Sequence, residues 1–230
     1  MKITTLLTGK IGLLGQEGVP SGIKKKATLK KEKVSVLGLV NDEQADKKHH
    51  GGRDKAIHHY AFEHYNYWKN VPDISLPGML REGGFGENIS TMGMDESTIC
   101  IGDKYRVGSV VLEVSQARQP CWKLNLRFGH PNMSRMVQDS LRTGWYYRVL
   151  EEGWIQAGDH FTLLDRTCPE WPLKRLLHLL YIDMKNERLL EEMTHIGPLS
   201  EAWKKTVRQR LETGEIEDWN HRLYNKSPKI

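Results

Sequence analysis

Ser109–Asn125 reads SVVLEVSQARQPCWKLN, an alternating strand pattern followed by a turn that carries a cysteine. Over Ser109–Ser115, apolar side chains alternate with their neighbours, which is the period of a β-strand. Pro120 lacks a backbone donor and fixes the local turn. Cys121 therefore stands just past a strand end, where reactive groups are commonly displayed.

Basic residues surround Cys121 in the sequence, namely Arg118, Lys123 and, farther on, Arg127. A thiol acts as a nucleophile or metal ligand only as the thiolate, and positive charge close in space favours that form. These residues predict a chemical site at Cys121. For this stretch alone, the alternative is a free cysteine buried as a small hydrophobe, which is the commoner case.

The composition is that of a globular protein, with 38% hydrophobic and 27% charged residues among 230. No apolar run is long enough for a signal peptide or for a membrane span of roughly 18 residues. We therefore expect a cytoplasmic protein without a membrane partner. The three cysteines are odd in number and lack Cys-x-x-Cys spacing, so we expect reduced thiols.

A net charge of +5 weakly indicates anionic partners. The densest basic run lies within residues 24–33 and comprises Lys24, Lys25, Lys26, Lys30, Lys31 and Lys33. No aromatic residue interleaves with these lysines, as single-stranded nucleic acid would require. We expect a solvated loop there and no nucleic-acid partner.

Short strands on both sides of a helical insertion predict a mainly β protein with α-helices, built as a closed or nearly closed β-barrel. The expected strands are residues 3–8, 34–40, 98–101, 105–107, 110–114, 145–150, 154–155 and 160–164, and the insertion runs from Cys121 to about Leu141. From residue 169 the apolar period becomes helical. The predicted domains are a β-barrel over residues 1–168 and a small three-helix domain over residues 169–230, whose last helix carries a solvated basic face with Lys204, Lys205, Arg208 and Arg210.

Two glycine-rich segments are candidates for ligand contact. Gly51 and Gly52 precede an expected helix that is capped by Asp54 and has its apolar face at Ile57, Tyr60, Ala61, Tyr65 and Trp68. Together with Arg53 and Lys55, the free amides at such a helix start predict an anion cradle. The second segment, Gly83–Ile89, carries Glu87 and Asn88, which suit hydrogen bonds to a polar heterocycle.

The histidines raise two alternatives. Residues 49–64 contain His49, His50, His58, His59 and His64, which suggests a zinc hydrolase, but no pair has the i, i+4 spacing that puts two ligands on one helix face. A cysteine nucleophile with a histidine base is the second alternative; its geometry is spatial and stays open here. It leaves both glycine-rich segments without a function. We expect one histidine, His50 first among them, to be functional.

Three ordered motifs together resemble the MOSC domain, the fold shared with the C-terminal region of molybdenum cofactor sulfurases. They are HHGGRDKAIH at residues 49–58, FGEN at residues 85–88 and QPCWKL at residues 119–124. The resemblance is to the YiiM-like branch, whose members also carry a C-terminal three-helix domain, and it covers nearly the whole chain. It implies a MOSC-type β-barrel with a cleft for the molybdenum cofactor.

The resemblance also implies roles for residues of the motifs. Cys121 matches the family cysteine that ligates molybdenum and is the expected catalytic residue. The expected cofactor-binding residues are His50, Gly51, Gly52, Arg53, Lys55, Glu87, Asn88, Arg118 and Lys123. Asp54 is expected to cap a helix rather than support the site.

Characterised members of this family reduce N-hydroxylated compounds such as N-hydroxylaminopurine, amidoximes and hydroxylamines. The resemblance therefore implies a molybdenum-cofactor reductase with a small N-hydroxylated substrate. No flavin, haem or iron–sulfur motif is visible, so electrons are expected from a separate flavoprotein or ferredoxin-like protein. The alternative is a non-catalytic cofactor carrier or sulfur-transfer partner.

Overall fold

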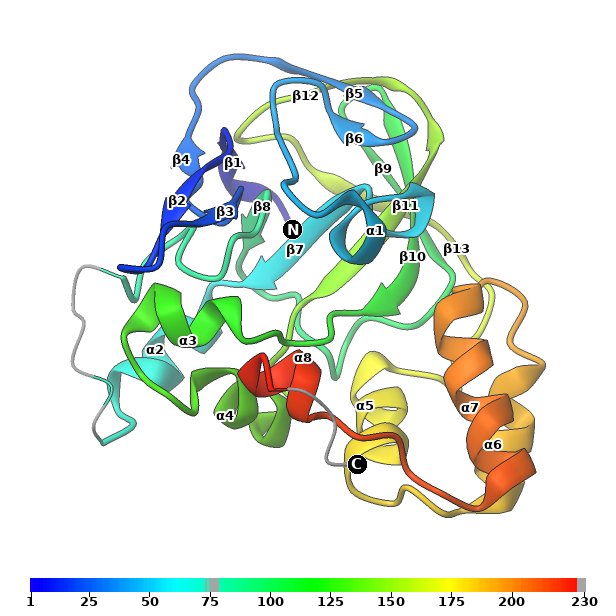
Figure 1. Cartoon of the computed structure of the whole chain (residues 1–230). Coiled ribbons are helices and arrows are strands. Elements are labelled where there is room, and N and C mark those ends of the chain that lie inside the picture. The colour runs from blue at the N-terminus through cyan, green and yellow to red at the C-terminus, as the bar shows by residue number, and fades with distance from the viewer. Residues whose placement is uncertain (73, 75–78, 227–230) are drawn as a thin grey trace.

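The chain forms a curled β-sheet with helices gathered along one side and at one end (Figure 1). The computed structural model describes residues 1–72, 74 and 79–226. The main sheet contains β1 Ile3–Thr8, β4 Lys26–Ala27, β7 Ile57–Ala61, β8 Ile89–Thr91, β9 Asp103–Val107, β10 Val110–Ala117, β11 Trp145–Glu151 and β13 Phe161–Arg166. Smaller pairings involve β2 Gly12–Leu14, β3 Val19–Ser21, β5 Glu32–Ser35, β6 Gly38–Leu39 and β12 Gly153–Ile155.

The main sheet has the strand order β13-β9-β10-β11-β7-β8-β1-β4 and is antiparallel except between β7 and β8. The sheet curls so that the start of β1 meets the start of β13. There Lys2 forms a β-bridge with His160, and Ile3 N donates to Asp159 O at 2.9 Å. These bonds bring the curled sheet close to a closed barrel, which confirms the predicted mainly β fold class. Every residue of β10 is buried, so the strand that leads to Cys121 is anchored in the core.

Three predicted elements differ in the structure. Ile57–Ala61 is a strand rather than a helix, because it pairs with β11 on one side and β8 on the other. Residues 34–40 form the hairpin β5–β6 instead of one strand, with Gly38 at φ 112°. Residues 98–101 form a turn in which the amides of Thr98 and Ile99 both donate to Asp95 O.

The helices are α1 Lys47–His50, α2 Glu63–Lys69, α3 Lys123–Phe128, α4 Met133–Ser140, α5 Leu173–Tyr181, α6 Glu187–Thr194, α7 Glu201–Thr213 and α8 Asn220–Tyr224, with the 3-10 helix η1 Arg53–Lys55. The expected three helices after residue 169 are α5, α6 and α7. α8 was not predicted. No helix in the part of the chain that is described has the length and apolar character to cross a membrane.

One apolar core runs from the barrel into these helices without a break, through residues such as Leu112, Leu176 and Trp203. The boundary between residues 168 and 169 stays a prediction. The basic face expected on the last predicted helix is wrong for Arg210, which is buried and forms an ion pair with Glu217. Its Nη1 also donates to Leu180 O, so this arginine fastens α7 to α5.

Candidate functional site

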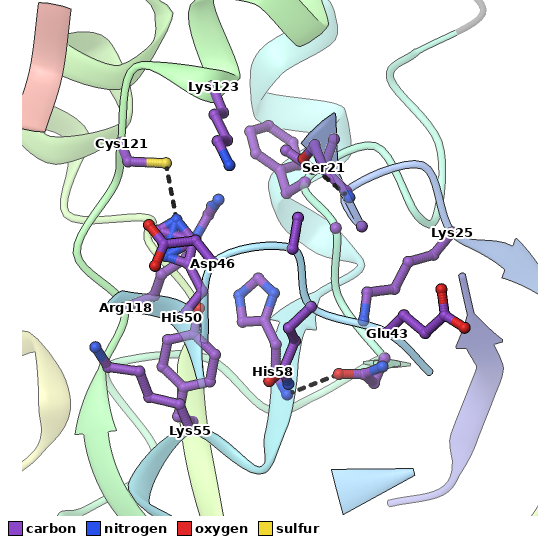
Figure 2. A pocket seen from close by; sticks show the side chains of 18 of the residues that line it. Ser21, Lys25, Glu43, Asp46, His50, Lys55, His58, Arg118, Cys121 and Lys123 are labelled. Atoms are coloured by element: carbon purple, nitrogen blue, oxygen red, sulfur yellow. Dashed lines mark hydrogen bonds between the residues drawn. The ribbon is translucent and has the colours of Figure 1, made fainter. Parts of the chain in front are cut away.

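A cavity of about 680 Å³, its open mouth included, lies between the barrel wall and the segment that carries Cys121 (Figure 2). It brings together most of the side chains expected from the sequence: His50, Lys55, Asn88, Arg118, Cys121 and Lys123. The remaining lining comes from Ser21, Gly22, Ile23, Lys25, Glu43, Gln44, Ala45, Asp46, His58, Phe85, Gly86, Gln119 and Tyr146. Segments far apart in the sequence therefore build one site.

Cys121 occupies the short turn between β10 and α3. Arg118 leaves the strand with its backbone amide bonded to Gly144 O at 2.9 Å, and Cys121 O accepts from Leu124 N as α3 begins. The Cys121 side chain is half-buried, and its sulfur points toward the His50 ring (Figure 2). The Sγ to Nε2 distance is 3.5 Å. This placement leaves the thiol accessible to a bound group.

His50 ends α1, a helix whose first turn is capped by Asp46. The Asp46 carboxylate accepts from the His49 amide at 3.0 Å. Burial, followed by the positive charge of Lys55, lowers the pKa of His50 to about 4. The imidazole is therefore neutral at neutral pH, and its Nε2 meets Cys121 as an uncharged group.

Two buried polar atoms in the cavity wall have no hydrogen-bond partner among the described residues. They are Nη1 of Arg118 and Nε2 of His58. The Arg118 side chain is charged and only 6% exposed, and an unpaired buried donor of this kind costs free energy. Buried polar groups in folded proteins normally have partners. An acceptor-rich ligand in the cavity would supply them.

His58 was not predicted as a site residue, although its position follows once Ile57–Ala61 is a strand. Adjacent strand residues point to opposite faces. His58 thus faces the cavity beside Tyr146, its register partner on β11, with ring centroids 5.0 Å apart. His59 points into the barrel and bonds Tyr147 and Thr91. Burial lowers the pKa of His58 well below its ordinary value.

The cavity lining carries more positive than negative charge. Lys25, Lys55, Lys123 and Arg118 are opposed by the carboxylates of Glu43 and Asp46. Lys55 Nζ donates to His49 O at 2.6 Å and Lys123 Nζ to Pro20 O at 3.1 Å, so both ammonium groups are held at the rim by backbone oxygens. Such an arrangement favours an anionic ligand.

Lys25 corrects the expectation of a solvated basic loop. Its side chain is 7% exposed and forms an ion pair with Asp42, which Asn88 Nδ2 also contacts at 3.0 Å. Burial lowers the pKa of Lys25, while Asp42 acts in the opposite direction. Nothing in the sequence of the lysine run distinguishes Lys25 from the other lysines or predicts that its side chain is buried.

The structure does not bring Gly51, Gly52, Arg53 or Glu87 to the cavity lining. Gly52 has φ 98° and precedes only the three-residue η1, so the long helix expected to form an anion cradle is absent. Glu87 is fully buried, where it accepts from Tyr65 OH and from Gly83 N at 2.7 Å. Burial raises its pKa.

Asp54 and Asn88 both have structural partners. Asp54 does not cap a helix; its carboxylate accepts from Nε and Nη2 of Arg148, at 2.9 and 2.7 Å. Asn88 accepts from His58 N at 3.1 Å and donates to Leu7 O at 3.3 Å. Asn88 therefore ties β7 to β1 at the cavity wall, and a contact between its amide and a heterocycle stays a prediction.

The zinc alternative finds no support in residues 1–72, 74 and 79–226. No group of three or more histidine, cysteine, aspartate or glutamate side chains gathers there as a metal site. His64, for example, pairs with Glu96 at 2.6 Å, away from the cavity. The structure does place Cys121 beside a histidine, but the lowered pKa of His50 makes it a poor proton acceptor for a thiol nucleophile.

Comparisons with known proteins cover almost the entire chain. The MOSC domain matches residues 46–162, and the YiiM-like, 3-alpha helix domain matches residues 171–214. Protein YiiM of Escherichia coli is 36% identical over 223 residues, covering 95% of this chain and 96% of YiiM. A protein of Gibberella moniliformis named Reductase is 36% identical over 88% of this chain, which spans 36% of that longer protein.

A solved structure gives the same answer as the sequence matches. The crystal structure of YiiM from Escherichia coli superposes with a TM-score of 0.81 at 28% identity, covering 97% of this chain and 99% of YiiM. The resemblance seen in the sequence motifs is thereby confirmed. The chain belongs to the MOSC domain family and is homologous to YiiM.

Proposed function

We propose that the chain binds the molybdenum cofactor in this cavity and reduces small N-hydroxylated compounds with electrons from a separate protein. The observation that carries the proposal is that the half-buried Cys121 thiol lines the same cavity as Arg118, whose buried Nη1 has no hydrogen-bond partner among the described residues. A soft thiolate suits a transition metal, and a guanidinium suits the phosphate of a pterin cofactor. Membership of a family associated with this cofactor supports the same conclusion.

The lining residues fit specific parts of such a group. Cys121 would ligate the molybdenum, and Arg118 with the rim ammonium groups of Lys55 and Lys123 would bind the anionic portion. His58 Nε2, which also has no partner in the described part of the chain, would hydrogen-bond the heterocycle. When bound, the cofactor supplies the two-electron chemistry that removes oxygen from nitrogen, and the protein orients the substrate and excludes water.

The fungal relative named Reductase supports the reductive direction, since its match covers 88% of this chain. The test is turnover by protein produced in cells that make the cofactor, with a reduced viologen dye as electron donor. We expect loss of N-hydroxylaminopurine and of an amidoxime, with the corresponding amine and amidine as products. Stoichiometric cofactor without turnover of any N-hydroxylated compound would instead indicate a carrier or sulfur-transfer partner.

We further propose that the electron donor is an acidic flavoprotein or ferredoxin-like protein that docks at the cavity mouth. Exposed lysines directly adjoin the lining residues: Lys24 and Lys26 flank Lys25, and Lys47 and Lys48 precede His50 on α1. A basic rim steers an acidic partner, and salt screens the attraction.

Turnover driven by such a protein donor should therefore fall steeply as ionic strength rises, while turnover driven by a neutral dye should not. Reversing the charge of the rim with Lys47→Glu and Lys48→Glu should reproduce the loss at low salt. The paired lysines are exposed, so folding should be unaffected. A flat salt profile with the protein donor would count against electrostatic docking.

A further inference from the structure

The last described helix, α8, lies against the segment that carries Cys121. In Figure 1 this helix, drawn in red, returns from the α5–α7 region to the barrel and rests beside α4. The residues that lead to it extend beyond the match to the YiiM-like, 3-alpha helix domain, which ends at residue 214. The proposed function does not explain why the chain returns to place α8 beside α4.

Arg222 on α8 bonds to the residues on both sides of Cys121. Its carbonyl oxygen accepts from Trp122 N at 2.7 Å, and its Nη1 donates to Pro120 O at 2.6 Å. Nη2 donates to Gln138 Oε1 on α4, also at 2.6 Å. A single residue therefore holds the peptide groups before and after the cysteine.

The neighbouring residue on α8 adds a second attachment. Leu223 is 1% exposed, and its carbonyl oxygen accepts from Asn125 Nδ2 on α3 and from Ser134 Oγ on α4, each at 2.8 Å. The helix that begins after Cys121 is thus fixed to α8 as well. By contrast, the Cys121 side chain has one described polar contact of its own, with His50 at 3.5 Å.

We propose that Arg222 is a positioning residue that fixes the direction of the Cys121 thiol into the cavity. Hydrogen bonds on both flanking peptides restrict rotation of the turn, so the sulfur is held ready for a ligand before the ligand arrives. The helical region thereby contributes to the site through α8 rather than only covering the barrel. The importance of this orientation for a metal rests on the proposed function, whereas the orientation itself does not.

The test compares Arg222→Ala with Arg175→Ala in the full-length, cofactor-free protein. Both arginines are half-buried, donate to a backbone carbonyl and lie over an aromatic ring, but Arg175 donates to Glu170 O and lies over the Trp171 ring at the start of α5. Iodoacetamide labelling of each cysteine is followed by mass spectrometry of peptides. Cys100 and Cys168, both buried, report any general unfolding.

We expect Arg222→Ala to raise the labelling rate of Cys121 at least about fivefold, the factor for loss of one ordinary hydrogen bond. Arg175→Ala should leave that rate unchanged, and Arg222→Lys, which keeps a charge and a donor, should fall between wild type and Arg222→Ala. Equal rates in wild type and Arg222→Ala, or an equal rise in both alanine variants, would overturn the proposal.

Hydrogen exchange in the unaltered protein tests the same contact without a variant. The amides of Trp122 and of α8 should exchange at similar rates, because one opening event exposes both. Immediate exchange at Trp122 while α8 stays protected would also overturn the positioning role of Arg222. Molybdenum content after production in cofactor-making cells then separates the two proposals. If Cys121 labelling responds to Arg222 but even the wild type holds no molybdenum, the proposed function fails while the positioning role stands.

Discussion

Cys121→Ala protein produced in cells that make the molybdenum cofactor should contain little or no molybdenum and should not reduce N-hydroxylated compounds. Among the side chains that line the cavity, Cys121 offers sulfur, which suits a transition metal, whereas the other polar side chains offer nitrogen and oxygen. Loss of supporting groups around metal ligands already costs about 10–100-fold in affinity, and we expect loss of the ligand to cost at least as much. Elemental analysis and pterin fluorescence measure the two parts of the cofactor separately.

Cys100→Ala is the matched control for this change. Cys100 is 3% exposed, its Sγ contacts Pro169 O at 3.6 Å, and neither residue lines the cavity. Its loss should leave molybdenum and pterin at wild-type amounts. A Cys121→Ala protein that keeps a full complement of molybdenum and normal turnover would remove the ligand role. Zinc without pterin, indifferent to Cys121, would return attention to the histidines.

The parts of the site that the sequence could predict are those carried by short, local motifs. Cys121, Arg118 and Lys123 belong to one short segment, and His50 and Lys55 belong to another. Residues so close along the chain stay close in space in any fold. The strand pattern predicted a barrel, but only the resemblance to a family indicated that these motifs would meet at one cavity in it.

The residues that prediction missed depend on pairing between distant segments. The apolar spacing of Ile57–Trp68 fits a helix, yet its first part is a strand because β11 and β8 supply partners for its backbone groups. That change alone moves His58 into the cavity and His59 away from it. Lys25 turned inward for a similar reason, since its partner Asp42 lies on another loop.

Arg118→Met should weaken cofactor binding about 10- to 100-fold, the range for loss of a hydrogen bond to a charged group. It should do so without lowering the free energy of unfolding of the cofactor-free protein by more than about 1 kcal/mol. The buried Nη1 has no hydrogen-bond partner among the residues that the structure describes, and methionine fills much of the same space without a charge. Removing the unpaired buried charge should stabilise the cofactor-free protein, whereas losing the attraction between Arg118 and buried Glu87 should destabilise it. We therefore expect a small net change in the free energy of unfolding. Urea unfolding and molybdenum content measure the two effects.

Arg148→Met separates a binding arginine from a structural one. Arg148 lies on strand β11, and its guanidinium forms ion pairs with Asp54 and, at 2.6 Å, with Glu113. Its loss leaves the carboxylates of Asp54 and Glu113 without this ion-pair partner and should lower the free energy of unfolding by about 1–3 kcal/mol. The protein that remains folded should still bind the cofactor. The opposite outcome, an Arg118→Met protein that unfolds as easily as Arg148→Met yet binds the cofactor at wild-type affinity, would make Arg118 part of the scaffold. The buried Nη1 of Arg118 would then no longer identify where the anionic ligand sits, because a group retained for binding is expected to weaken the ligand-free protein rather than support it.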